Sequence, residues 1–158
     1  MNLFRELHDL CIEKQIYLAT AESCTAGLLA SSIVSISGAS LFFKGGVIAY
    51  HNDIKIKILG VSKSNIDKKT EVCSEVVEQM AEGVRERLAV DFSLATSGYA
   101  GPGGGTELNP TGTIFIAVSS NERTISKRFL FTGDRQSVIN KGTVKAVELL
   151  LQELKKSY

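Results

Sequence analysis

The sequence is poor in the residues that build disulfide frameworks and metal sites. It contains three cysteines and two histidines among 158 residues. Cys11, Cys24 and Cys73 show no C-x-x-C spacing, so we expect reduced thiols in a cytoplasmic protein. Two histidines without a neighbouring group of acidic or sulfur ligands do not build an ordinary zinc site. We therefore expect neither a metal nor another cofactor.

Strong charge and long apolar runs are missing as well. Eighteen Lys and Arg residues against 17 Asp and Glu residues leave a net charge of +1, so no nucleic-acid partner is expected. No apolar run approaches the roughly 20 residues that a membrane-spanning helix needs, so no membrane partner is expected either. The start of the chain mixes acidic and basic residues, unlike a secretory signal. Without repeats or linkers, residues 1–158 are predicted to form a single domain.

Hydrophobic periodicity predicts helices and strands that alternate along the chain. A hairpin is predicted late, with its turn at Asn121-Glu122. Within one strand, Gly45-Gly46 indicates a bulge or a close backbone approach. This order is typical of an α/β fold, a three-layer α/β/α domain around a mixed β-sheet. Helices are expected at residues 2–14, 23–37, 52–59, 74–88 and 134–156, and strands at 16–21, 42–51, 91–97, 113–120 and 124–131.

One lysine occupies a position where the local field disfavours a cation. Asn52 is a good N-cap residue, which would put Lys55 in the first turn of a helix. The positive end of the helix, together with burial, would lower the pKa of Lys55. A lysine that loses its proton easily can act as a general base. The plainer alternative is that Lys55 bends back to water or pairs with Asp53 or Glu71.

A serine and two chain segments add further candidate chemistry. Ser40 lies just before the start of a strand, where a neighbouring amine could activate its hydroxyl group. Ser37 is an alternative nucleophile. The simpler interpretation is that Ser40 is an ordinary turn serine that bonds its own backbone. Six glycines fall in residues 96–112, so this segment is either an anion-binding or a flexible loop. The segment that contains Glu22 either caps a helix or faces a ligand.

In order, the segments AESCTAG, GASLFFKGGVIAYHNDIK, LGV, TSGYAGPGGG and PTGTIFIAV resemble the CinA C-terminal domain family. The similarity covers nearly the whole chain. Characterised members of this family are nicotinamide mononucleotide deamidases. The resemblance implies a metal-independent amidohydrolase that forms nicotinate mononucleotide and ammonia in pyridine nucleotide salvage. It also implies the α/β/α fold, a homo-oligomer and, because the chain begins at the amidase helix, the stand-alone form of the family.

The resemblance also assigns roles to individual residues. Ser40 matches the nucleophilic serine, Lys55 its base, and Tyr50 the member of the hydrogen-bond chain between them. Oxyanion donors are expected near Ser40 or in the loop 101–105. The residues predicted to bind the substrate are Glu22, Ser23, Ser97, Gly98, Gly101, Gly103 and Arg135.

Three departures from the family pattern bear on substrate affinity. Ala26 stands where many members have glycine, Val72 falls in a segment that reads Gly-Ala-Val-Ser in the family, and Ile139 lies where arginines are common. Two alternatives to the enzyme remain open. A nucleotide-binding module would hold the mononucleotide without releasing ammonia, and a competence- or damage-related binding domain would retain its partner after Ser40 is mutated.

Overall fold

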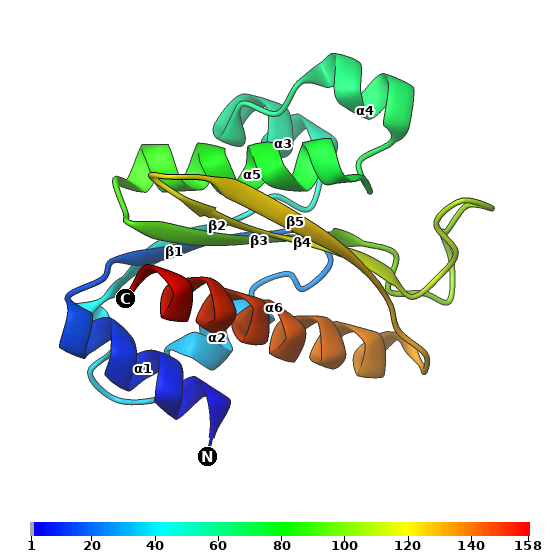
Figure 1. Ribbon diagram of the computed structural model, residues 1–158. Helices are drawn as coiled ribbons and strands as arrows, with labels where there is room; N and C mark the ends of the chain where they lie inside the picture. The colour runs from blue at the N-terminus through cyan, green and yellow to red at the C-terminus, as the bar shows by residue number, and fades with distance from the viewer. Residues whose placement is uncertain (1) are drawn as a thin grey trace.

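The structure is a computed structural model that describes residues 2–158 and contains one five-stranded sheet (Figure 1). Its strands are β1 (Leu18–Glu22), β2 (Phe43–Ile48), β3 (Phe92–Gly98), β4 (Thr113–Ser120) and β5 (Thr124–Leu130). Their order in the sheet is β2-β1-β3-β4-β5. β2, β1 and β3 run parallel, whereas β3, β4 and β5 are antiparallel to their neighbours. The carboxyl ends of the three parallel strands therefore lie together, and the β4–β5 turn lies at the opposite ends of these strands.

Helices cover both faces of this sheet. They are α1 (Leu3–Lys14), α2 (Leu28–Ile33), α3 (Asn52–Leu59), α4 (Lys63–Lys69), α5 (Ser74–Leu88) and α6 (Arg135–Ser157), with one short 3-10 turn, η1 (Ala39–Leu41). Helices α1, α2 and α6 lie on one face, and α5 lies on the other with α3 and α4 outside it (Figure 1). The predicted α/β/α fold around a mixed sheet is confirmed.

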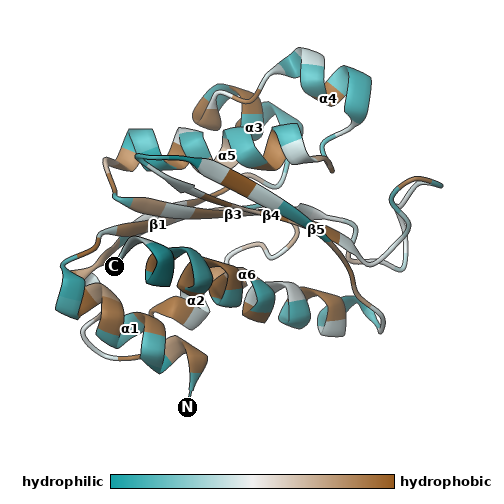
Figure 2. Cartoon of the chain, in the orientation of Figure 1, coloured by the Kyte–Doolittle hydropathy of each residue, from teal (hydrophilic) through white to brown (hydrophobic). Residues whose placement is uncertain are grey.

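Two apolar clusters, one on each face, hold the layers together. Successive strand residues point to opposite faces, so Leu94 of β3 joins the cluster beneath α1 and α6, while Ala95 joins the cluster beneath α5. Ile116 and Ala117 of β4 divide in the same way. Figure 2 shows brown, hydrophobic residues between the layers and a largely hydrophilic α4. The cluster on the α5 side includes small strand residues, among them Ala21, Ala95 and Ala117.

The glycine pair in β2 marks a close approach, as predicted. A Cβ atom on Gly46 would lie 2.3 Å from Thr20 Oγ1 of β1. The pairing of β1 with β2 also shifts register between Leu18 and Ala19, opposite Phe43 and Gly45. Gly45 has φ +150°, which glycine adopts without strain.

The helix predicted at residues 23–37 is much shorter than expected. A turn occupies residues 24–27, and α2 begins only at Leu28. Ala26 has φ +44° and Gly27 has φ +99°, both in the left-handed region that cannot continue a right-handed helix. The turn leaves Ser23 at the end of β1 instead of inside a helix.

Ala26→Gly is expected to stabilise the protein by about 1 kcal/mol, because alanine is strained at a positive φ and glycine is not. Urea denaturation of both proteins measures the change in the free energy of unfolding. Ala30→Gly, within α2, is the matched control and should destabilise instead. A destabilised Ala26→Gly variant would contradict the backbone conformation described here.

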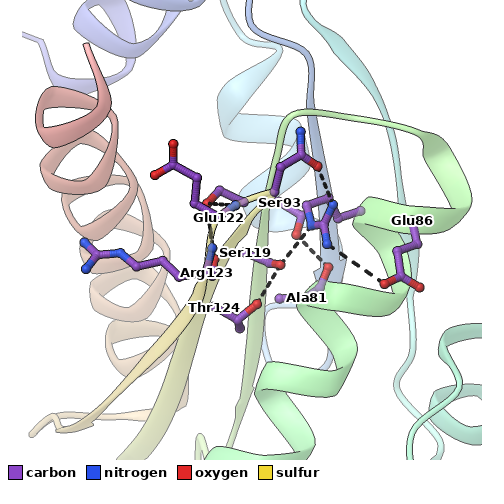
Figure 3. A network of polar contacts seen from close by, with 10 residues as sticks. Ala81, Glu86, Ser93, Ser119, Glu122, Arg123 and Thr124 are labelled. Atoms are coloured by element: carbon purple, nitrogen blue, oxygen red, sulfur yellow. Dashed lines mark hydrogen bonds and ion pairs between the residues drawn. The ribbon is translucent and has the colours of Figure 1, made fainter.

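A network of hydrogen bonds surrounds the β4–β5 turn (Figure 3). Arg85 of α5 donates to Ser119 Oγ at 3.0 Å and to Asn121 Oδ1 at 2.8 Å. Ser119 and Thr124 share a further hydrogen bond of 2.8 Å between their hydroxyl oxygens. These hydrogen bonds connect α5 to the hairpin and pair its polar groups with one another, so this region has a structural role. The carboxyl ends of the parallel strands lie on the opposite side of the sheet.

Candidate functional site

A pocket of about 240 Å³ lies where the three parallel strands end. Ser23 follows β1, Tyr50 follows β2 by two residues, and Gly98 is the last residue of β3. Open α/β sheets bind ligands at the carboxyl ends of their strands. Six residues predicted from the sequence line this pocket, namely Ser23, Tyr50, Lys55, Gly98, Gly103 and Arg135.

Lys55 is buried at the base of this pocket. Its side chain is only 1% exposed, and Nζ donates to the backbone oxygen of Tyr50 at 3.3 Å. Within residues 2–158, no carboxylate lies within ion-pair distance of Lys55. Helix α3 is capped by His51, one residue earlier than predicted, and Lys55 remains close to its start. The reading in which Lys55 bends back to water is therefore wrong.

Burial lowers the pKa of Lys55, and the negative charge of Glu71 partly opposes this effect. Glu71 also lines the pocket. The neutral amine is therefore easier to form than on a surface lysine. An amine of this kind is suited to accept a proton from a hydroxyl group.

Glu71→Gln is expected to lower the pKa of Lys55 further, because it removes the carboxylate that favours the ammonium form. An NMR titration of a ¹³Cε-labelled Lys55 measures this pKa directly. Glu75→Gln, which removes a carboxylate that pairs with the exposed Lys69, serves as the control and should leave the pKa of Lys55 unchanged. A higher Lys55 pKa in Glu71→Gln would refute the electrostatic argument.

Arg135 forms a fixed cationic group at the pocket. It is the first residue of α6, which is capped by Asp134. Its Nη1 donates to the Gly101 oxygen at 2.8 Å and its Nη2 donates to Tyr50 Oη at 3.1 Å. Gly101 thus positions Arg135 and does not line the pocket itself. The remaining N–H groups of the guanidinium are available to an anionic group of a ligand.

Two further residues predicted to bind substrate are engaged inside the fold. Glu22 is 1% exposed and accepts hydrogen bonds from Thr25 Oγ1 at 2.6 Å and the Leu29 N–H at 2.8 Å. Ser97 is fully buried and donates to the Glu71 backbone oxygen at 2.8 Å. Neither side chain lines the pocket. Glu22 caps α2, and Ser97 positions the segment that carries Glu71.

Glu22→Gln is expected to lower the free energy of unfolding by about 1–3 kcal/mol, because it turns one acceptor oxygen into a donor facing buried N–H and O–H groups. Chemical denaturation measures this loss. Glu13→Gln removes an exposed carboxylate beside Lys14 and should change stability by less than about 0.5 kcal/mol. Equal effects of the two substitutions would contradict the capping role.

Ser40 lies apart from this pocket in its own chain. It is exposed in η1, which precedes β2, whereas Tyr50 and Lys55 follow β2. A strand rises about 3.3 Å per residue, so the intervening strand alone spans roughly 20 Å. The structure therefore does not bring Ser40 to Lys55 within one chain. The serine that it does bring into the pocket is Ser23.

Sequence reasoning missed other residues of the pocket. Asn52 was expected only as a helix cap, and Tyr99 only as part of a glycine-rich loop, yet both line the pocket. Cys24 lines it too, but burial raises the pKa of its thiol to about 12. At neutral pH the sulfur therefore stays protonated and is a poor nucleophile. The position of Tyr99 directly after the last residue of β3 was the signal that could have identified it.

The remaining departures from the family pattern lie in packed segments. Val72 is buried beneath α5, and Ile139 packs against the apolar cluster on the α6 side. Across the described residues 2–158, no three His, Cys, Asp or Glu side chains are grouped to hold a metal ion. In the same part of the chain, no helix combines the length and apolarity that crossing a membrane requires.

The chain is similar in sequence to CinA proteins. Residues 1–154 match the sequence profile of a family described as the CinA C-terminal domain. A CinA-like protein from Flavobacterium psychrophilum is 38% identical over 96% of this chain, and one from Fervidobacterium nodosum is 43% identical over 92%. The chain spans only 36% and 37% of the length of these two relatives.

Solved structures of CinA-related proteins are similar to this chain in fold. A competence-damaged protein (CinA) superfamily protein from Escherichia coli shares 34% identity and a TM-score of 0.92, over 96% of this chain and 88% of its own. The competence damage-inducible protein A from Klebsiella pneumoniae shares 31% identity and a TM-score of 0.93, over 97% of this chain and 95% of its own.

Proposed function

Because the chain belongs to the CinA C-terminal domain family, we propose that its pocket deamidates nicotinamide mononucleotide to nicotinate mononucleotide and ammonia, with a serine and a lysine as the reacting side chains. The observation that carries this proposal is the buried Lys55, whose pKa is lowered by burial, in a pocket at the strand ends. The substrate is the one implied by the sequence resemblance.

The groups around the pocket suit the parts of this substrate. Its phosphate is anionic, and the Arg135 guanidinium has free N–H groups to receive it. Its pyridinium ring is cationic, and the pocket offers it the carboxylate of Glu71 and the aromatic ring of Tyr99. Charge complementarity of both kinds favours a nicotinamide nucleotide over a neutral amide.

The proposed reaction proceeds through an acyl-enzyme. The neutral amine of Lys55 takes the proton of a serine hydroxyl, whose oxygen attacks the carboxamide carbon. Backbone N–H groups of the glycine-rich loop stabilise the oxyanion, a contribution of roughly 3–4 kcal/mol per donor. Ammonia leaves with the proton from Lys55, and water then hydrolyses the ester. The candidate serines are Ser23, which lines the pocket, and Ser40, which the resemblance implies.

Ammonia release from nicotinamide mononucleotide by the purified protein tests this function. We expect release at the same rate with and without a chelator. Calorimetry with the same nucleotide is the companion measurement. Binding without ammonia release would overturn the enzyme in favour of a nucleotide-binding module, and neither binding nor release would favour a partner-binding domain.

A further inference from the structure

A single carboxylate faces the pocket at the strand ends. Among the residues of the described chain 2–158 that line this pocket, Lys55 and Arg135 are basic and Glu71 is the one acid. A ligand whose ring is positively charged would meet two like charges here and one opposite charge. Like charges in a binding site disfavour a ligand as strongly as opposite charges favour it. Glu71 is therefore the side chain that decides whether a cationic ring is accepted.

The backbone is strained directly before Glu71. Thr70, which follows α4, has φ +68° and ψ 172°. Glycine adopts this conformation easily, whereas a β-branched residue is strained in it. Such strain persists only where the surrounding contacts hold it, and it is concentrated at ligand-binding segments. Here it turns the chain between α4 and α5 at the residue that lines the pocket.

Hydrogen bonds from two other parts of the fold hold this segment in place. The hydroxyl of Ser97 in β3 donates to the Glu71 backbone oxygen at 2.8 Å. Asn109 Nδ2 of the glycine-rich loop donates to the Val72 backbone oxygen at 3.2 Å, and the Val72 N–H donates to Thr70 Oγ1 at 3.2 Å. The backbone of Glu71 is therefore positioned before any ligand binds, which lowers the cost of ordering the site.

The carboxylate of Glu71 is not used in an ion pair. Within residues 2–158, no Lys, Arg or His side chain lies within ion-pair distance of it. Burial lowers the pKa of Lys55 and the charge of Glu71 opposes this, so the two groups are near each other without being in contact. The ring of Tyr99 lines the same pocket and also attracts cations. Glu71 is thus free to face a cationic part of a ligand.

We propose that Glu71 makes the pocket select nicotinamide nucleotides with an oxidised, cationic ring over reduced ones, whose dihydropyridine ring is neutral. The selection deepens the proposed function and rests on it for the class of ligand. Both forms carry the same phosphate, ribose and carboxamide, so Arg135 contributes equally to the binding of each. The ring charge is the difference that Glu71 detects, and specificity is this difference in binding free energy. The pocket would therefore deamidate the oxidised mononucleotide and leave the reduced one intact.

Binding without turnover tests this selection. A Ser23→Ala/Ser40→Ala protein lacks both candidate nucleophiles, so calorimetry can measure its Kd for oxidised and for reduced nicotinamide mononucleotide. The oxidised form should bind about tenfold more tightly, which is the effect of one opposite charge near a charged group. Glu71→Gln in the same protein should bring the ratio of the two Kd values to about one. Glu71→Asp keeps the charge and should retain most of the preference.

Glu75→Gln is the matched control, because Glu75 pairs with the exposed Lys69 and does not line the pocket. It should keep the preference. A preference that survives Glu71→Gln, equal binding of the two forms, or binding of neither would overturn the selection. Ammonia release by the wild-type protein reports separately on the proposed function. Release without a Glu71-dependent preference would refute the selection alone, and a preference without release would refute deamidation alone.

Discussion

Lys55→Met should abolish ammonia release and at the same time make the protein more stable. The amine is the proposed general base, and loss of such a group costs on the order of 10²- to 10⁴-fold in rate. The ammonium form is also costly to bury, since the side chain is 1% exposed and burial lowers its pKa. Methionine fills a similar volume without charge. The gain in the free energy of unfolding is expected to be about 1 kcal/mol at neutral pH.

The pH dependence of this gain has a definite sign. Because the pKa of Lys55 is lower in the folded protein than its ordinary value of 10.5, the unfolded chain binds more protons between the two values. Wild-type stability therefore rises through that window. The advantage of Lys55→Met should be greatest at neutral pH and below and should vanish above about pH 11. Thermal unfolding at pH 7 and pH 11 checks this.

The exposed Lys57 on the same helix supplies the control. Lys57→Met should keep full activity and show no comparable pH-dependent gain in stability. Ammonia release by Lys55→Met near the wild-type rate would remove Lys55 from the base role. A loss of stability in that variant would show that the buried amine is better satisfied than its contacts indicate.

Ser40→Ala should reduce ammonia release by roughly 10³-fold or more, as expected when a nucleophile is removed. This expectation rests on the sequence resemblance, because Ser40 is exposed and lies outside its own chain's pocket. Stability should change by less than about 0.5 kcal/mol, since a surface hydroxyl is removed. Steady-state kinetics and urea denaturation measure both quantities.

Ser37→Ala is the matched control, because Ser37 is also exposed and precedes the same short turn. It should retain wild-type activity. Near-wild-type activity of Ser40→Ala would exclude that serine as the nucleophile and leave Ser23, which lines the pocket, as the candidate.

The regular elements could be predicted because their residues repeat with the period of the element. Helix α5 is amphipathic over its whole length and was predicted with its bounds, Ser74–Leu88. Helix α4 was missed because it buries no residue and so carries no apolar stripe. The length of α2 depended on two left-handed residues, and Ala26 gave no sign of its positive φ.

The site could be predicted only in part. Lys55 and Arg135 stand at helix starts, which residue preferences reveal. Whether Glu22 faces a ligand or a helix N-terminus depends on the packing around it, which sequence does not show. Ser40 and Tyr50 are close in sequence, but an extended strand lies between them and keeps them apart. Proximity along a strand is therefore a poor guide to proximity in a site.

The burial of the Cys24 thiol affects which nucleophile the pocket can use. Sulfur is ordinarily a stronger nucleophile than oxygen, and Cys24 lines the same pocket as the serine. Because burial raises the pKa of its thiol to about 12, very little of the sulfur is present as thiolate at neutral pH. Oxidants and alkylating reagents act on the thiolate and should find little to attack. The loss of solvation around Cys24, and not its size, thus keeps the thiol protonated and leaves the hydroxyl and amine groups as the reactive side chains of the pocket.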